Sequence, residues 1–272
     1  MRSYPNIGII GLGHIGMACV QGWSEKGSGL RLYALDRHAE QQQKAKVYGV
    51  TICEDFQDLM AHCSYIVLAV RPKQIIPLLK QIQAVKGEGS PALISLAAGL
   101  GLASLKQHYP AAKISRCMPN ISMACGEGVL ALQENDSLGE EHKKTWLDVF
   151  SLLGKIFWLK TDHEMHLCTA LAGSGPAFVL FVLRQLAQSS IKLGLESQLA
   201  EEMIVQTALG ICRYQQLNRV SMSKIIGQIA TEGGTTAKGI DQLQQSEIEC
   251  ILQEVVKVTS KRAFELDQLI SE

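Results

Sequence analysis

The segment most indicative of the fold is Ile7-Gly8-Ile9-Ile10-Gly11-Leu12-Gly13-His14-Ile15-Gly16. Its first four residues form an apolar run of β type, which leads directly into the pattern GxGxxG and then into a helical pattern. In this context the glycines are typical of a dinucleotide-binding βαβ unit. Gly11 allows the tight turn, Gly13 lets the backbone approach a pyrophosphate, and Gly16 lets helix and strand pack closely. The phosphates then meet N–H groups at a helix N-terminus.

The rest of the first half alternates short apolar runs with helical patterns, which is typical of a parallel sheet with helices on both faces. After about Lys160 the strand signal stops and only helical patterns follow. We therefore expect a doubly wound, mainly parallel α/β Rossmann domain over residues 1–160 and an all-helical domain over 161–272. The further strands are expected at residues 30–35, 50–53, 65–70, 92–96, 113–117 and 155–159, and the main later helices at 176–193, 199–217, 223–229 and from 246 onward.

The composition argues against a nucleic-acid-binding or membrane-binding protein. Among 272 residues, 26 Lys and Arg balance 26 Asp and Glu, so the basic excess that nucleic acid or an anionic membrane requires is missing. The eight cysteines are scattered and form no CxxC pair, which favours reduced thiols in the cytoplasm. The apolar stretch Leu167–Leu183 is interrupted by Gly173-Ser174-Gly175-Pro176, so we expect no transmembrane helix.

The choice of dinucleotide depends on the residues after the second strand. Asp36 lies twenty residues beyond Gly16, where an acid accepts hydrogen bonds from the ribose hydroxyls of NAD and repels a 2′-phosphate. Arg37 follows it, and an arginine at this place can accommodate NADP. The sequence therefore predicts NAD(P)H as cofactor, with a slight lean to NADH, and a surface-turn role for Asp36 is the alternative.

Three further turns are candidates for the site. Ala97-Ala98-Gly99 ends one expected strand and Met118-Pro119-Asn120 ends the next. In the helical half, Glu232-Gly233-Gly234-Thr235-Thr236 precedes a helix, and glycines with hydroxyls at a helix start can bind a substrate carboxylate. An ordinary capped turn is the alternative for that loop. The pair His163 and His166 lacks the four convergent ligands of a zinc site, so no metal is expected.

Six segments, in order along nearly the whole chain, resemble motifs of the pyrroline-5-carboxylate reductase family. They are Ile9-Ile10-Gly11-Leu12-Gly13-His14-Ile15-Gly16, Leu68-Ala69-Val70-Arg71-Pro72, Ser95-Leu96-Ala97-Ala98-Gly99-Leu100, Arg116-Cys117-Met118-Pro119-Asn120, Ala172-Gly173-Ser174-Gly175-Pro176-Ala177-Phe178 and Gly233-Gly234-Thr235-Thr236.

The resemblance implies reduction of 1-pyrroline-5-carboxylate to proline in a homodimer, with rings of dimers in some members. It also implies that Thr236 hydrogen-bonds the ring nitrogen, that Gly233, Gly234 and Thr235 hold the carboxylate, and that Asp162 lies near the substrate. The cofactor residues that the motifs and the resemblance predict are Ile10, Gly11, Leu12, Gly13, His14, Ile15, Gly16, Asp36, Arg37, Ala69, Val70, Arg71, Pro72, Ala97, Ala98, Gly99 and Asn120.

The chain departs from the family pattern around Glu232-Gly233-Gly234-Thr235-Thr236, which we call the threonine loop. Glu232 replaces a proline beside the expected anion site, and the Lys-Asp pair expected upstream is missing from Ser221–Gly227. The family's late-competence branch shows similar changes, so a regulatory paralogue with little reductase activity is one alternative, and a reductase of a related cyclic imine is another. A β-hydroxyacid dehydrogenase is a third, but Lys192 comes too late in its expected helix to be the catalytic lysine of that class.

Overall fold

The computed structural model describes residues 4–26, 29–85, 90–109, 113–133 and 138–271. It divides into two compact units: unit 1 comprises residues 1–174 and 258–272, and unit 2 comprises residues 175–257. The division after residue 160 that the sequence suggested differs from this one, because α7 (Asp162–Cys168) and the end of the last helix belong to the sheet-bearing unit.

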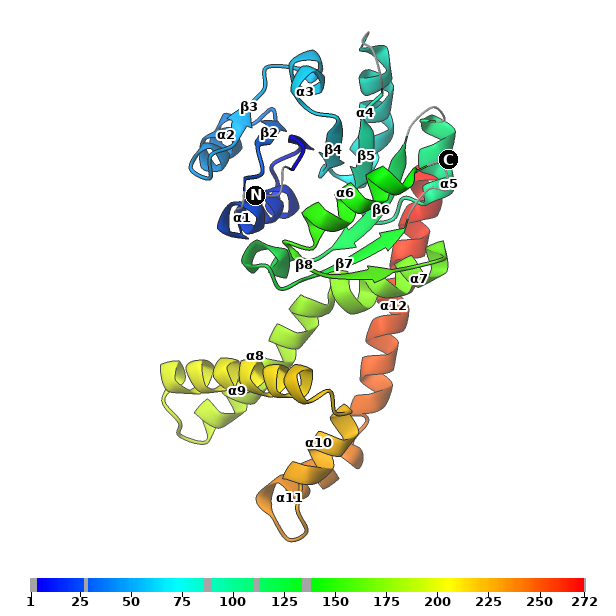
Figure 1. Cartoon of the computed structure of the whole chain (residues 1–272). Helices are drawn as coiled ribbons and strands as arrows, with labels where there is room; N and C mark the ends of the chain where they lie inside the picture. The colour runs from blue at the N-terminus through cyan, green and yellow to red at the C-terminus, as the bar shows by residue number, and fades with distance from the viewer. Residues whose placement is uncertain (1–3, 27–28, 86–89, 110–112, 134–137, 272) are drawn as a thin grey trace. The chain divides into compact units, whose positions relative to one another are not determined.

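Unit 1 is built on an eight-stranded sheet in the order β3-β2-β1-β4-β5-β6-β7-β8 (Figure 1). Strands β1 to β6 are parallel, and β7 pairs antiparallel to β6. The chain order reverses between β1 and β4, which is where open α/β sheets bind ligands. The strands are β1 Ile7–Ile10, β2 Leu32–Leu35, β3 Thr51–Ile52, β4 Tyr65–Leu68, β5 Ala92–Ser95, β6 Ile114–Pro119, β7 Gly128–Gln133 and β8 Gly154–Trp158.

Helices cover both faces of this sheet, because its strands carry apolar side chains on both sides. One core packs Trp23 of α1 with Trp146 and Phe150 of α6, and the other packs Leu59 of α3 with Leu79 of α4. The doubly wound, mainly parallel fold predicted from the sequence is thereby confirmed. The helices of this layer are α1 His14–Lys26, α2 Ala39–Lys46, α3 Phe56–His62, α4 Pro72–Ala84, α5 Leu102–His108 and α6 Glu140–Phe150, and a 3₁₀ helix, η1, spans Ile121–Cys125.

The regular elements of unit 2 are all helices, as predicted. It contains α8 Gly175–Lys192, α9 Ser197–Asn218, α10 Met222–Ile229, α11 Thr235–Gln244 and the first part of α12 Ile248–Ser271. Helices α8 and α9 pack against each other. Little of this unit is buried, and large apolar side chains such as Leu180, Phe181 and Leu209 are more than half exposed.

Only a bend at Ser174 separates the helical segments on either side of it. Helix α7 Asp162–Cys168 continues through a π-helical turn, η2 Thr169–Gly173, into α8. Pro176 is tolerated because it lies in the first turn of α8, where its missing N–H has no intrahelical partner to lose. The resulting helix, residues 162–192, is long and apolar enough to cross a membrane by length and composition. Core helices of water-soluble proteins meet the same criterion of length and composition.

Candidate functional site

The glycine-rich loop lies between β1 and α1, at the carboxyl edge of the sheet. Gly11 has φ +97°, and a Cβ there would lie 2.7 Å from the carbonyl oxygen of Ala69. A Cβ on Gly16 would lie 2.0 Å from the carbonyl oxygen of Gly11, so only glycine permits this close packing. Gly13 is exposed, and a Cβ there would have no atom within 4 Å. The loop thus combines a tight, glycine-dependent turn with open space over Gly13, which is the cradle that a pyrophosphate requires.

Asp36 follows β2, and its carboxylate turns toward the glycine-rich loop. The backbone N–H of Leu12 donates to its Oδ2 at 2.6 Å, and the N–H of His38 donates to its Oδ1 at 2.8 Å. Burial raises the pKa of Asp36, but the hydrogen bonds from Leu12 and His38 outweigh this and hold the pKa below its ordinary value. With its side chain only 8 % exposed, Asp36 braces the loop, whereas Arg37 beside it is exposed.

The turn after β4 lies beside the glycine-rich loop at the carboxyl edge of the sheet. The N–H of Ala69 donates to the carbonyl oxygen of Ile10 at 2.8 Å, which ties the turn to β1. Val70 flanks Gly11, and Arg71 precedes α4, which begins at Pro72. The N–H of Arg71 donates to Oε1 of Gln74 at 3.1 Å. The predicted residues of this segment therefore lie at the same corner as the glycine-rich loop.

The turn after β5 carries Ala97, Ala98 and Gly99. Gly99 has φ +63°, and a Cβ there would lie 2.6 Å from the Cβ of Leu266 on α12. The neighbouring Gly101 donates its N–H to Oδ1 of Asp267 at 2.7 Å. This turn is thus held by residues far along the chain, which no local pattern in the sequence indicated.

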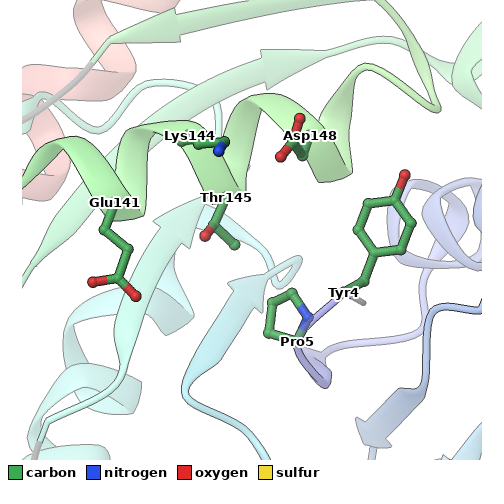
Figure 2. A pocket seen from close by; sticks show the side chains of 6 residues that line it. All are labelled: Tyr4, Pro5, Glu141, Lys144, Thr145 and Asp148. Carbon is green, nitrogen blue, oxygen red and sulfur yellow. The ribbon is translucent and has the colours of Figure 1, made fainter. Parts of the chain in front are cut away.

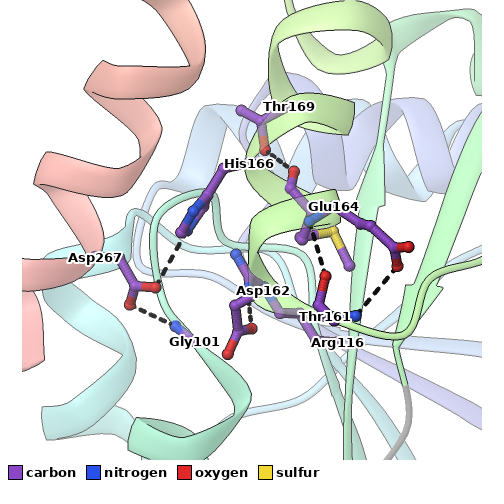
Figure 3. A network of polar contacts seen from close by, with 9 residues as sticks. Gly101, Arg116, Thr161, Asp162, Glu164, His166, Thr169 and Asp267 are labelled. Carbon is purple, nitrogen blue, oxygen red and sulfur yellow. Dashed lines mark hydrogen bonds and ion pairs between the residues drawn. The ribbon is translucent and has the colours of Figure 1, made fainter.

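Two residues predicted near the reacting groups already have protein partners. Asn120 is buried; its Nδ2 donates to the carbonyl oxygen of Ala172 at 3.1 Å, and its Oδ1 accepts from the N–H of Val129 at 3.2 Å. Asp162 begins α7, and its Oδ1 lies 2.8 Å from a guanidinium nitrogen of Arg116 (Figure 3). The substrate role of Asp162 and the cofactor role of Asn120 remain predictions.

Arg116 itself was missed as a site residue, although it stands in the segment Arg116–Asn120. Its side chain is fully buried, and its Nε and second terminal nitrogen have no hydrogen-bond partner among the described residues. Burial lowers the pKa of Arg116, while the charges of Asp162 and Asp267 raise it. A buried arginine beside two carboxylates is an electrostatic anchor for the edge between β6, α7 and α12.

In unit 2, the threonine loop lies before α11. Gly233 has φ +74°, and Gly234 precedes the first helical residue, Thr235. Thr235 and Thr236 are exposed in the first turn, and within unit 2 as described neither hydroxyl has a hydrogen-bond partner. The predicted helix start is confirmed, and its N–H groups and hydroxyls are available to an anion.

A shallow hollow elsewhere in unit 1 has a different character. It lies between Tyr4 and Pro5, before β1, and Glu141, Lys144, Thr145 and Asp148 of α6 (Figure 2). Because it is at the amino end of β1, it is at the opposite edge from the glycine-rich loop. No group of three potential metal ligands occurs in the portion of the chain that the structure describes.

Family models match both halves of the chain. The model described as "pyrroline-5-carboxylate reductase dimerisation" matches residues 162–266, and "NADP oxidoreductase coenzyme F420-dependent" matches residues 6–99. A pyrroline-5-carboxylate reductase from Aquifex aeolicus is 27% identical, with 96% of this chain and 97% of that protein aligned. The corresponding enzyme from Pseudomonas aeruginosa is 26% identical over 99% and 100% of the two chains.

Solved structures agree along the whole length. A pyrroline-5-carboxylate reductase from Coxiella burnetii superposes with a TM-score of 0.89 at 25% identity, covering 97% of this chain and 99% of that one. A pyrroline carboxylate reductase from Plasmodium falciparum, with NADP bound, has a TM-score of 0.85 at 23% identity and covers 98% and 100%. At this identity, the similarity to the P. falciparum protein shows that the two chains share a fold.

Proposed function

We propose that the chain is a member of the pyrroline-5-carboxylate reductase family, to which its relatives and its dimerisation-type second half are similar, and that it reduces the C=N bond of 1-pyrroline-5-carboxylate to give L-proline. The single observation that carries the proposal is the glycine-rich loop, where Gly11 and Gly16 admit only glycine and Gly13 leaves space for a pyrophosphate. The relatives align over nearly all of both chains.

Reduction of the imine requires the protein mainly to bind and orient the substrate and the cofactor. The cofactor supplies a hydride to the imine carbon, and the electron pair of the C=N bond passes to a nitrogen that carries a proton. In the proposal, the turn of Gly233, Gly234 and Thr235 holds the substrate carboxylate, and the hydroxyl of Thr236 hydrogen-bonds the ring nitrogen. The N–H of Gly234 donates to the carbonyl oxygen of Thr231 at 3.0 Å, so the carboxylate accepts from the N–H of Thr235. Positioning of this kind supplies much of the rate where the substrate is already an electrophile.

We infer that the cofactor is NADPH. The P. falciparum relative holds NADP, and the model matched by residues 6–99 describes an NADP oxidoreductase. The lean to NADH rested on Asp36, but its carboxylate is engaged by Leu12 and His38 and largely buried. The exposed guanidinium of Arg37 is then the group placed to pair with a 2′-phosphate.

We propose that the working form is a cytoplasmic homodimer, which the family resemblance extends to rings of dimers. Helices α8 and α9 leave Leu180, Phe181, Met203 and Leu209 more than half exposed. A monomer rarely exposes so much apolar surface, whereas an obligate dimer buries it as a core cut in half. The same burial accounts for the apolar helix without a membrane. All eight cysteines are free thiols, in keeping with a reducing compartment.

A paralogue that binds dinucleotide without reducing the imine is the second candidate, and Glu232 is the observation that favours it. This carboxylate is exposed directly before Gly233, where it would repel a substrate carboxylate. Hydroxyacid dehydrogenase chemistry is less suited, because Lys192 is the last residue of α8.

One assay separates these functions: NADPH oxidation with 1-pyrroline-5-carboxylate, beside 3-hydroxyacids with NADP and a reaction without substrate. Turnover with the imine alone supports the proposal. NADPH binding without turnover of any substrate supports the paralogue, and turnover of the hydroxyacids contradicts both.

A further inference from the structure

The end of α12 is joined to the turn after β5, although the two are separated by more than 160 residues. Oδ1 of Asp267 accepts from the N–H of Gly101 at 2.7 Å, in a buried hydrogen bond. The residue before it, Leu266, packs closely against Gly99. A Cβ added to Gly99 would lie 2.6 Å from the Cβ of Leu266. Two consecutive residues of α12 therefore hold the two glycines of the turn.

The carboxylate of Asp267 is itself oriented from a second element. Its Oδ2 lies 3.2 Å from Nε2 of His166 on α7, and the two side chains are 12% and 7% exposed (Figure 3). Phe264, one helical turn before Asp267, meets the His166 ring edge-on at 5.7 Å between centroids. The positive charge of buried Arg116 faces the same group and offsets the cost of burying a carboxylate.

The turn held in this way is part of the proposed cofactor site. It follows β5, which lies beside β4 at the carboxyl edge where the chain order reverses. A turn with glycines at positions 99 and 101 has high conformational freedom, and ordering it on binding would weaken the affinity. A turn that is already fixed avoids that loss.

We propose that Asp267 is a positioning residue for the dinucleotide, which holds the backbone of residues 97–101 in its binding conformation from the far end of the chain. The inference rests on the proposed function, because it takes residues 97–99 to be part of the cofactor site. It adds the last helix to the machinery that sets cofactor affinity.

The test measures NADPH affinity by fluorescence titration of the full-length protein, well below the unfolding temperature of each variant. Asp267→Ala should raise the Kd for NADPH by about tenfold, the scale of one lost buried hydrogen bond. Asp267→Asn keeps an acceptor for Gly101 and should stay within about threefold of wild type. Glu265→Ala, which removes a surface pair with Arg262 on the same helix, is the matched control and should change nothing.

If the role of Asp267 is purely structural, Asp267→Ala lowers the thermal stability and leaves the affinity for NADPH at the wild-type value. That result overturns the inference. If Asp267→Ala does not fold, His166→Phe decides, because it removes the contact of His166 with Oδ2 of Asp267 while keeping an aromatic ring against Phe264. It should weaken NADPH binding about threefold, and an unchanged Kd contradicts the inference. Wild type that binds NADPH without reducing the imine contradicts the proposed reaction and leaves this readout intact.

Discussion

Substitution of Gly13 by alanine isolates the binding function of the glycine-rich loop from its folding. A Cβ at Gly13 meets no protein atom within 4 Å, and its φ lies outside the left-handed region, so the free protein accepts alanine without strain. We expect its stability to change by less than about 1 kcal/mol. The methyl group would occupy the space through which a pyrophosphate approaches, and overpacking of this kind costs about 1–3 kcal/mol.

That cost corresponds to a Kd for NADPH raised about five- to a hundredfold. The assay is NADPH fluorescence titration, with thermal unfolding of the free variant measured in parallel. Gly139→Ala is the matched control, because a Cβ there also meets no atom within 4 Å but lies at the start of α6. Unchanged NADPH affinity in Gly13→Ala would refute the placement of the pyrophosphate over this loop.

Further consequences concern folding, catalysis, pH and assembly. Gly16→Ala should lower the stability of the free protein by about 1–3 kcal/mol in thermal unfolding, because its Cβ would fall 2.0 Å from the carbonyl oxygen of Gly11; an unchanged Tm would contradict this. Thr236→Val should lower kcat/KM about ten- to a hundredfold while the Kd for NADPH stays constant, since a hydrogen bond to a charged group is lost; intact turnover would place the substrate elsewhere. Hydrogen bonds from Leu12 and His38 hold the pKa of Asp36 below its ordinary value, so the stability that its carboxylate contributes is present above the ordinary pKa of an aspartate and is lost as pH falls through the lowered pKa. Stability should therefore decline less in Asp36→Asn than in wild type on acidification, as urea titrations would measure. Light scattering at low micromolar concentration should find dimers or larger assemblies, and a stable folded monomer would contradict the interface on α8 and α9.

The sequence predicted the parts of the fold that local pattern encodes. The structure confirms the tight turn at Gly11 and the close packing at Gly16, because both depend on glycine geometry within one βαβ unit. Strand β7 was missed. Its run from Gly128 to Gln133 is almost wholly buried, so it lacks the alternation that distinguishes a strand, and it is antiparallel to its neighbour β6.

The polar contacts that shape the site could not be predicted from the sequence, because they join distant segments. Asp267 and Gly101 carry no shared pattern, and Arg116 meets Asp162 across 46 residues. The direction of the Asp36 side chain is a similar case. Its position after β2 was predicted, but only the structure reveals that its carboxylate accepts a hydrogen bond from the N–H of Leu12.

The most direct test of the proposed reaction follows the transferred hydrogen. Wild-type protein is incubated with 1-pyrroline-5-carboxylate and NADPH carrying deuterium at C4 of the nicotinamide, on the face from which the hydride leaves, with the opposite-face isotopomer as control. The proline formed should carry one deuterium at C5 with the first isotopomer and none with the second, as measured by mass spectrometry. A protein that binds NADPH yet gives no proline above the reaction without enzyme would contradict the account.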